Sequence, residues 1–519
     1  MRVPLTIGGF LERAGTVYPE RLALVDEPSV AGTLGRITYE ELHARARGMA
    51  VTLDAMGIGP GERVAIVSPN SGRFLTSYFG VSGFGRVLVP VNYRLNAEEI
   101  AFIIEHSGSR LLLVDPELAD ALSGIPVKDR VVLDGVADAE LFAPAESSAK
   151  SSPEIRHVEI DEDSTCSINY TSGTTARPKG VQLTHRNCWL NAAMFGWHTT
   201  VTDRDTHLHT LPMFHCNGWG MPYAITAMGG THVVQRKIDG DVILERVGQE
   251  GVTLMCGAPA VVAAILDAVQ KLNTEGKPIP GSGSTRIVVA GAPPPSKTIE
   301  RVETELGWEF IQIYGLTETS PLLTINRATE EMAQLSPADR AAALSRAGVP
   351  AVGVQIDVDD NDEILARSNH VFAGYWEQPE ATEDALEGGW FHTGDGGWMD
   401  GPYVVVADRK KDVIISGGEN VSSIEVEDCL YQHEAVAEVA VIGVPDDRWG
   451  ETVKALVVLR PEHQATEVEL IEHCRSRMAH FKAPRSVEFR TALDRTATGK
   501  LQKFKLRQPY WQGRDKQVN

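Results

Sequence analysis

The chain has 519 residues, of which 43% are hydrophobic and 23% are charged, a composition typical of a globular protein with an ample core. At about 150 residues per domain, this length predicts roughly three units, or fewer if one of them is a large α/β body. The net charge is −21, from 49 Lys and Arg against 70 Asp and Glu, which disfavours nonspecific binding to nucleic acid or anionic lipid. An anionic ligand must therefore be held by a local site.

Cysteine usage and the chain ends indicate the compartment. The six cysteines are scattered, and no Cys-x-x-Cys pair suggests zinc or a redox motif, which favours a reducing environment. The N-terminal segment turns polar at Glu12, too early for a secretory signal, and no later apolar run approaches membrane-spanning length. Residues 516–519 form no peroxisomal or prenylation signal. We expect a cytoplasmic protein without membrane insertion.

The elements predicted in chain order alternate between strands and helices. Helical patterns cover residues 97–106 and 189–197, and short apolar runs between them read as buried strands. This alternation predicts an α/β fold whose parallel sheet is covered on both faces, with ligands at the carboxyl ends of the strands. The predicted strands are 63–68, 86–90, 110–115, 206–211, 229–234, 252–256, 286–290 and 309–314.

The pattern changes after Gly353, where short β-type segments with Gly and Asp turns continue to Trp398. A charged joint at residues 408–412 then precedes a compact α/β tail of about a hundred residues, which is the size of a domain. We place the boundary in this joint. The sequence thus predicts an N-terminal domain at 1–410, with a β-rich part, and a C-terminal α+β domain at 411–519.

The most informative stretch is 170–181, a run of hydroxyl residues and glycines that predicts a phosphate-holding loop. Its glycines permit a close backbone approach, its hydroxyl and N–H groups suit phosphate oxygens, and Lys179 supplies the countercharge. The P-loop pattern of ATPases fails, because Pro178 stands where the second glycine is required. An ordinary polar turn is the alternative. The residues expected to bind phosphate are Thr171, Ser172, Gly173, Thr174, Thr175 and Lys179.

Residues 170–181 closely resemble the phosphate loop of the acyl-adenylate-forming superfamily, which includes acyl-CoA synthetases, firefly-type luciferases and peptide-synthetase adenylation domains. Five further segments resemble the family's motifs in the family's order, namely 214–219, 314–319, 389–395, 408–419 and 495–500. The resemblance covers nearly the whole chain. It implies a large N-terminal body, a small mobile C-terminal lid, and an AMP-forming acyl-CoA synthetase. In that reaction a carboxylate attacks the α-phosphate of ATP to give acyl-AMP and pyrophosphate, and the thiol of CoA then displaces AMP.

The resemblance implies roles in ATP binding. Glu318 would hold Mg²⁺ near the Ser172 hydroxyl, and its alternative role is that of a helix N-cap acid. Thr317 would bond the α-phosphate. Asp395 would accept both ribose hydroxyls, Arg409 would bond the same sugar, and Gly-Asp is otherwise an ordinary turn pair. The residues expected around adenine are Gly291, Ala292, Pro293, Tyr314 and Gly315, with Tyr314 stacked on the ring.

The resemblance also assigns the lid. Lys500 lies in a Thr-Gly-Lys turn, and its ordinary role would be that of a solvated surface lysine. Its family role is to enter the adenylation site and bridge the substrate carboxylate and the α-phosphate, which requires a moving lid. Lys411 would be the residue about which the lid rotates, and Gly417 and Gly418 would then line the CoA channel.

His215 gives the clue to the acid. A histidine beside apolar residues is commonly a core residue, but in this family it stands at the mouth of the acyl pocket, and we expect a substrate gate. The neighbouring Asn217, Gly218 and Trp219 suggest a pocket narrowed by the indole. This version resembles synthetases of short- and medium-chain acids, including branched, thioether and aromatic ones. A long-chain fatty acid–CoA ligase is the alternative.

Two departures and two competing functions remain. Ala176 replaces a usual glycine, which stiffens the loop at a cost of roughly 1 kcal/mol, and Asp494 replaces the proline common before Arg495. Neither removes a group expected to contact ATP. The competing functions are an acyl-AMP ligase that loads a carrier-protein thiol and a catalytically silent binding protein with this fold. A catalytically silent protein is disfavoured by the joint presence of Lys179, Glu318, Asp395, Arg409 and Lys500. The sequence does not decide between a monomer and a homodimer.

Overall fold

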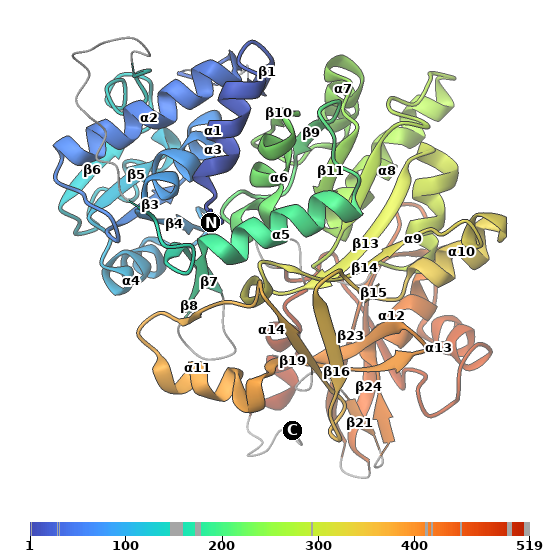
Figure 1. The fold of residues 1–519 in the computed structure, drawn as a ribbon. Coiled ribbons are helices and arrows are strands. Elements are labelled where there is room, and N and C mark those ends of the chain that lie inside the picture. The colour runs from blue at the N-terminus through green and yellow to red at the C-terminus, as the bar shows by residue number, and fades with distance from the viewer. Residues whose placement is uncertain are drawn as a thin grey trace.

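The computed structural model describes most of the chain, and its described part contains four β-sheets (Figure 1). It describes all residues except 2, 28–29, 31, 146–158, 172–177, 292–293, 410–413, 417–418, 447–448, 496–500 and 513–519. No helix in the described ranges is long and apolar enough to cross a membrane. The α/β fold class predicted from the alternation of strands and helices is confirmed.

The largest sheet has nine strands in the order β15-β14-β13-β12-β11-β9-β10-β1-β2. The strands from β13 to β1 run parallel, whereas β14, β15 and β2 pair antiparallel at the two ends. Five strands predicted from the sequence fall within it. The bounds are β1 (Leu22–Val25), β2 (Arg36–Thr38), β9 (Thr206–His209), β10 (Thr231–Val234), β11 (Leu254–Gly257), β12 (Arg286–Val289), β13 (Glu309–Gly315), β14 (Leu322–Arg327) and β15 (Val349–Pro350).

A seven-stranded sheet in the order β18-β8-β7-β4-β3-β5-β6 forms the second half of the N-terminal body. Its parallel strands include the three predicted before residue 116, and the hairpin β7–β8 brackets the predicted phosphate loop. The bounds are β3 (Arg63–Val67), β4 (Val87–Val91), β5 (Leu111–Val114), β6 (Asp129–Val132), β7 (Thr165–Thr171), β8 (Lys179–Thr184) and β18 (Gly374–Tyr375).

Helices cover these sheets, and the main hydrophobic core contains residues of both, such as Ile66 and Val288. Local capping sets several helix starts. Asn96, for example, accepts a hydrogen bond from the N–H of Glu99 at 2.9 Å, while the Glu99 carboxylate accepts one from Asn96. The helices are α1 (Gly8–Val17), α2 (Tyr39–Ala55), α3 (Gly72–Gly80), α4 (Ala97–Ser107), α5 (His185–His198), α6 (Met221–Met228), α7 (Gly240–Glu250), α8 (Pro259–Thr274), α9 (Ser296–Arg301), α10 (Pro337–Leu344) and α11 (Pro379–Ala385).

The β-rich part predicted after Gly353 is a four-stranded antiparallel sheet of β16 (Val354–Val358), β17 (Glu363–Ser368), β19 (Phe391–Asp400) and β20 (Tyr403–Arg409). The residues after 413 build a fourth sheet with its own hydrophobic clusters. Figure 1 shows this part in orange and red. Its elements are β21 (Ile414–Ser416), β22 (Glu419–Val421), α12 (Ser423–Tyr431), β23 (Val436–Asp446), β24 (Gly450–Leu459), α13 (Glu467–Arg475), β25 (Ser486–Phe489) and α14 (Lys503–Trp511).

A cluster of buried histidines lies in the N-terminal body. Nε2 of His209 on β9 lies 2.9 Å from Nδ1 of His232 on β10, and Nε2 of His232 lies 3.0 Å from the Thr226 hydroxyl. Burial lowers the pKa of His207 to about 3, and it lowers the pKa values of His209 and His232 well below their usual range. Two buried histidines elsewhere, His185 and His370, have pKa values lowered to about 4 by burial. These imidazoles are therefore neutral in the folded protein.

We expect acid to destabilise the fold through these histidines. In the unfolded chain they take up protons near pH 6.5, whereas the folded chain resists protonation until about pH 4. Their contribution to stability is complete above about pH 6.5 and is lost as the pH falls, by up to about 1.4 kcal/mol per pH unit for each histidine. Urea unfolding between about pH 7.5 and 4.5 measures the slope. The exposed-residue variant His480→Gln should retain this slope, and a flat profile down to pH 5 would contradict the expectation.

Candidate active site

The predicted metal ligand Glu318 lies in a short turn after β13, where it meets residues of the second sheet. Its carboxylate Oε1 accepts a hydrogen bond from the Tyr375 hydroxyl on β18 at 3.0 Å, and the residue is only 9% exposed. The ammonium of Lys179 on β8 lies 4.5 Å from the centre of the Tyr375 ring. The structure therefore brings the predicted carboxylate to the hydroxyl, and the predicted phosphate-loop lysine to the ring, of one tyrosine.

Tyr375 remains a neutral donor in this position. Burial, and secondly the Glu318 carboxylate, raise the pKa of its hydroxyl. The hydroxyl keeps its proton and donates a hydrogen bond to the negative Glu318 carboxylate, whereas an ionised tyrosine would repel that carboxylate. A carboxylate oxygen of this kind is what Mg²⁺ prefers, so the residues present fit a magnesium site. Ser172, the second predicted ligand, lies outside the described residues.

The turn that carries Glu318 is fixed by its backbone. A side chain at Gly315 would place its Cβ 1.6 Å from the carbonyl oxygen of Pro321, so only glycine fits there. The hydroxyl of Thr319 accepts the N–H of Leu316 at 3.0 Å and donates to the carbonyl of Pro321 at 2.6 Å. Thr317, the predicted α-phosphate contact, is buried in the same turn. These contacts fix the backbone of the turn and therefore the positions from which Thr317 and Glu318 extend.

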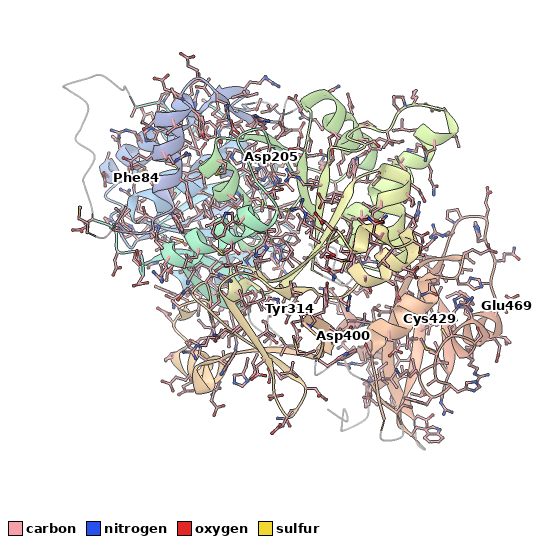
Figure 2. All side chains as sticks on the ribbon, turned by 45° about the vertical axis from the view of Figure 1, so that its right-hand side comes forward. Phe84, Asp205, Tyr314, Asp400, Cys429 and Glu469 are labelled. Carbon is pink, nitrogen blue, oxygen red and sulfur yellow. The ribbon has the colours of Figure 1, made fainter. Side chains whose placement is uncertain are left out.

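The predicted ribose ligand Asp395 meets the predicted adenine residue Tyr314. The Tyr314 hydroxyl on β13 donates a hydrogen bond to Asp395 Oδ2 at 2.9 Å, and Asp395 is 7% exposed on β19. Asp395 pairs in register with Arg409 on β20, whose backbone alone is described. Figure 2 labels Tyr314 where the N-terminal body meets the later β-rich part. The two predicted nucleoside residues are therefore brought together across two sheets.

The predicted acyl residues form a left-handed turn after β9. Five consecutive residues, 216 to 220, have φ values of 44°, 51°, 59°, 59° and 78°. Three of them are not glycine, and this conformation costs roughly 1–2 kcal/mol for each such residue. The thiol of Cys216 donates to the carbonyl oxygen of Thr317 at 3.9 Å, so this turn touches the turn of Glu318. The sequence alone does not indicate this conformation.

Packing holds the left-handed turn in place. The amide of Asn217, which is 2% exposed, donates to the Ser167 hydroxyl on β7 at 2.8 Å. Trp219 is 4% exposed, and its carbonyl accepts a hydrogen bond from the Asn191 amide on α5 at 3.2 Å. His215 is half-buried at the start of the turn, where its carbonyl accepts the N–H of Gly218 at 3.0 Å. The two partners outside the turn, Ser167 and Asn191, come from one sheet and one helix, so the turn is supported by two elements.

The remaining predicted residues divide into two groups. Thr171 pairs with Lys179 at the mouth of the β7–β8 hairpin, and Gly291 has φ +92° at the end of β12, where it begins the predicted adenine wall. The predicted residues that lie outside the described ranges are Ser172, Gly173, Thr174, Thr175, Ala292, Pro293, Lys411, Gly417, Gly418 and Lys500. Their positions stay predictions.

The sequence analysis did not identify Tyr375. It lies on a strand of two residues that pairs with β8, far away in sequence, and no local pattern marks it as a site residue. Its only local feature in the sequence is that it directly follows a glycine in the β-rich part. Tyr375 nevertheless contacts both charged groups of the candidate site.

Comparisons with known proteins identify the family of the chain. The family described as AMP-binding enzyme matches residues 11–376, and the AMP-binding enzyme C-terminal domain matches residues 425–500. A 2-methylpropanoate–CoA ligase of Humulus lupulus is 36% identical, over 97% of this chain and 95% of its own length.

Solved structures share the whole architecture. The anthranilate CoA ligase AuaEII in complex with anthranoyl-AMP is 26% identical, with a TM-score of 0.86 over 98% of both chains. MatB from Rhodopseudomonas palustris is 27% identical; its ATP-bound form has a TM-score of 0.82 over 97% of this chain and 99% of its own, and its apo form has 0.73 over 98% and 99%. The chain belongs to the AMP-binding enzyme family, and it is an AMP-forming acyl-CoA synthetase that uses ATP and CoA to activate a carboxylic acid.

Proposed function

We propose that the substrate is a compact carboxylic acid, of short to medium chain length and including branched, thioether or aromatic acids. The observation that carries this proposal is the buried left-handed turn, because it buries Trp219 and bonds its carbonyl to α5, where the indole would narrow the acyl pocket. His215 at the start of this turn is the gate of the acyl pocket. Relatives that act on 2-methylpropanoate and anthranilate support an acid of this size.

Glu318 is the proposed magnesium ligand, together with the Ser172 hydroxyl. The bound Mg²⁺ would supply positive charge to the phosphates of ATP. Tyr375 orients the Glu318 carboxylate through the hydrogen bond at 3.0 Å, and Lys179 supplies a second positive charge over the ring of the same tyrosine. Thr317 donates its hydroxyl to the α-phosphate. The leaving pyrophosphate is held by residues 171–175.

The nucleoside lies, in this proposal, between β13 and the β19–β20 pair. Asp395 accepts the ribose hydroxyls, and the Tyr314 hydroxyl fixes that carboxylate at 2.9 Å. Arg409, its register partner, bonds the same sugar. Adenine rests against Tyr314 and Gly315 on one side and the wall of residues 291–293 on the other.

The chain works as two proposed domains, 1–410 and 411–519. The separate hydrophobic clusters after residue 413 support this division, since a domain needs a core of its own. Lys411 is the pivot between them. Lys500 enters for acyl-adenylate formation, and rotation then brings Gly417 and Gly418 to line the CoA channel.

A panel of acids from C2 to C18, with branched and aromatic members, tests the proposed substrate class by CoA-dependent AMP formation. The highest kcat/KM is expected for compact acids. An optimum at C12 or longer would instead support the long-chain ligase. Rapid acyl transfer to a carrier-protein thiol, with little transfer to CoA, would support the carrier-loading alternative.

We expect Trp219→Gly to shift this preference toward longer or bulkier acids by about 10-fold in relative kcat/KM. Glycine adopts φ 59° without strain, which offsets part of the roughly 3 kcal/mol lost with a buried indole. The matched control is Trp197→Ala, since Trp197 lies exposed on α5. If the panel profile of Trp219→Gly equals that of the parent chain, Trp219 does not line the pocket.

We also propose that the enzyme acts in the cytoplasm. Its scattered cysteines, all six of which are free thiols in the structure, suit a reducing compartment. A homodimer is the oligomeric state we propose to test. Sedimentation of the purified chain would separate a dimer from a monomer of 56.4 kDa.

A further inference from the structure

Helix α12 of the C-terminal part contacts the N-terminal body through Asp428. Oδ1 of Asp428 accepts the backbone N–H of Ser296 at 3.0 Å, and the Ser296 hydroxyl donates to the same atom at 3.3 Å. Both residues are half-buried. Figure 2 labels the adjacent Cys429 on this helix, beside the N-terminal body. A carboxylate of one part therefore caps a helix of the other.

Helix α9 has no cap of its own. Ser296 is its first residue, and Pro294 and Pro295 before it have no N–H to donate. The N-cap position is Pro295, which makes no side-chain capping bond. Asp428 supplies the missing acceptor, and a negative carboxylate also suits the positive end of a helix. The sequence before Ser296 thus makes α9 dependent on an outside group.

The same helix α12 contacts Lys503, three residues after Lys500. The ammonium of Lys503 lies 2.9 Å from Glu427 Oε1 and also bonds the hydroxyl of Ser423. On the other side of Lys500 in the sequence, Arg495 pairs with Glu438 on β23 at 2.6 Å. Glu427 and Asp428 are neighbours. One helix therefore contacts both Lys503, which follows Lys500 closely in the chain, and α9, which follows the predicted adenine wall.

The observed arrangement resembles a nucleotide-bound state. As the TM-scores above show, the ATP-bound form of MatB matches it better than the apo form of the same protein does. The contact between Ser296 and Asp428 belongs to this arrangement.

We propose that the hydrogen bond between Asp428 and Ser296 is a latch that positions the C-terminal domain for acyl-adenylate formation. The latch acts on Lys500 through α12 and its contact with Lys503. Asp428 is therefore a positioning residue that does not touch the substrate. This inference rests on the proposed roles of Lys500 and of the two domains. It predicts that the latch serves the first half-reaction and opens before the second.

Two variants remove the latch from opposite sides. Asp428→Ala removes the acceptor. Ser296→Pro removes the donor but keeps the helix, because proline is well accepted at the first helical position and Pro295 has the extended backbone (φ −58°, ψ 141°) that a following proline requires. Each should lower acid-dependent ATP–pyrophosphate exchange about 3- to 10-fold, the effect of one hydrogen bond. Thioester formation from supplied acyl-AMP should stay within about 2-fold.

The double variant identifies the shared bond. Because both changes remove the same hydrogen bond, the double variant should lose no more exchange than the stronger single variant. The control is Glu425→Gln on the same helix, whose partner Lys482 at 2.7 Å belongs to the C-terminal part. It should leave both half-reactions unchanged. Asp428→Leu, which also lacks an acceptor, replaces Asp428→Ala if the latter does not fold.

The outcomes separate this inference from the proposed function. Loss confined to exchange, without further loss in the double variant, supports the latch. Equal loss in both half-reactions, no loss in either, or additive losses overturn it. A parent chain that shows no exchange with any acid of the panel would instead reject the proposed substrate class.

Discussion

Lys500→Ala is expected to abolish acid-dependent pyrophosphate release, with a fall of about 10²- to 10³-fold, the size of effect seen when one stabilising charge is removed from a transition state. The reason is that in-line displacement between a carboxylate and the α-phosphate brings two anions together, and the proposed role of Lys500 is to bridge them. Thioester formation from supplied acyl-AMP should stay within about 3-fold, because the lysine has then left the site.

A neighbouring lysine provides the matched control for this experiment. Lys505 lies exposed on α14, five residues after Lys500, and Lys505→Ala should leave both half-reactions unchanged. The decisive comparison is between the two half-reactions of Lys500→Ala. If both fall to the same extent, Lys500 does not act on one step alone, and the assignment of a separate lid is wrong.

Glu318→Gln is expected to lower adenylation about 100-fold and to raise the Mg²⁺ concentration needed for half-maximal rate. Glutamine keeps an oxygen that can accept the Tyr375 hydroxyl, so the turn should keep its shape while the negative charge is lost. The measurement is the initial rate of pyrophosphate release at a series of Mg²⁺ concentrations.

Tyr375→Phe is the control that separates the effect of the Glu318 charge from the effect of the hydrogen bond that holds this carboxylate. It removes the hydroxyl bonded to Glu318 but leaves the carboxylate, so a fall of less than about 10-fold is expected, since one hydrogen bond is lost. An unchanged Mg²⁺ dependence in Glu318→Gln would count against a metal role. In that case the carboxylate would act only as part of the hydrogen-bonded turn.

Sequence patterns predicted the parts of the fold that local physics determines. The strands at β3, β4 and β5 were visible because buried parallel strands are continuous apolar runs. The family resemblance predicted that Glu318, Asp395 and Tyr314 bind one nucleotide, and the structure shows the Tyr314 hydroxyl bonded to Asp395. The meeting of Tyr314 with Asp395 confirms that two distant motifs share one place. The roles of these residues stay proposals.

Three features could not be predicted, each for a physical reason. The left-handed turn at 216–220 includes Cys216 and Trp219, which avoid positive φ by local preference, so only their tertiary packing explains it. Tyr375 reaches the site through a strand of two residues, too short for any periodic signal. In the sequence Asp428 does not differ from other acids on a helix surface, because its contact with Ser296 depends on where α9 lies in the fold.

The segment 372–376 ties two regions together by backbone alone. The N–H of Phe372 donates to the carbonyl of Glu318 at 2.7 Å, and the N–H of Trp376 donates to the carbonyl of Gly180 at 2.7 Å. These two hydrogen bonds connect the carboxylate turn to the strand of Lys179. The segment therefore helps to fix the spacing between Glu318 and Lys179, the two charged residues that the proposed site would present to ATP.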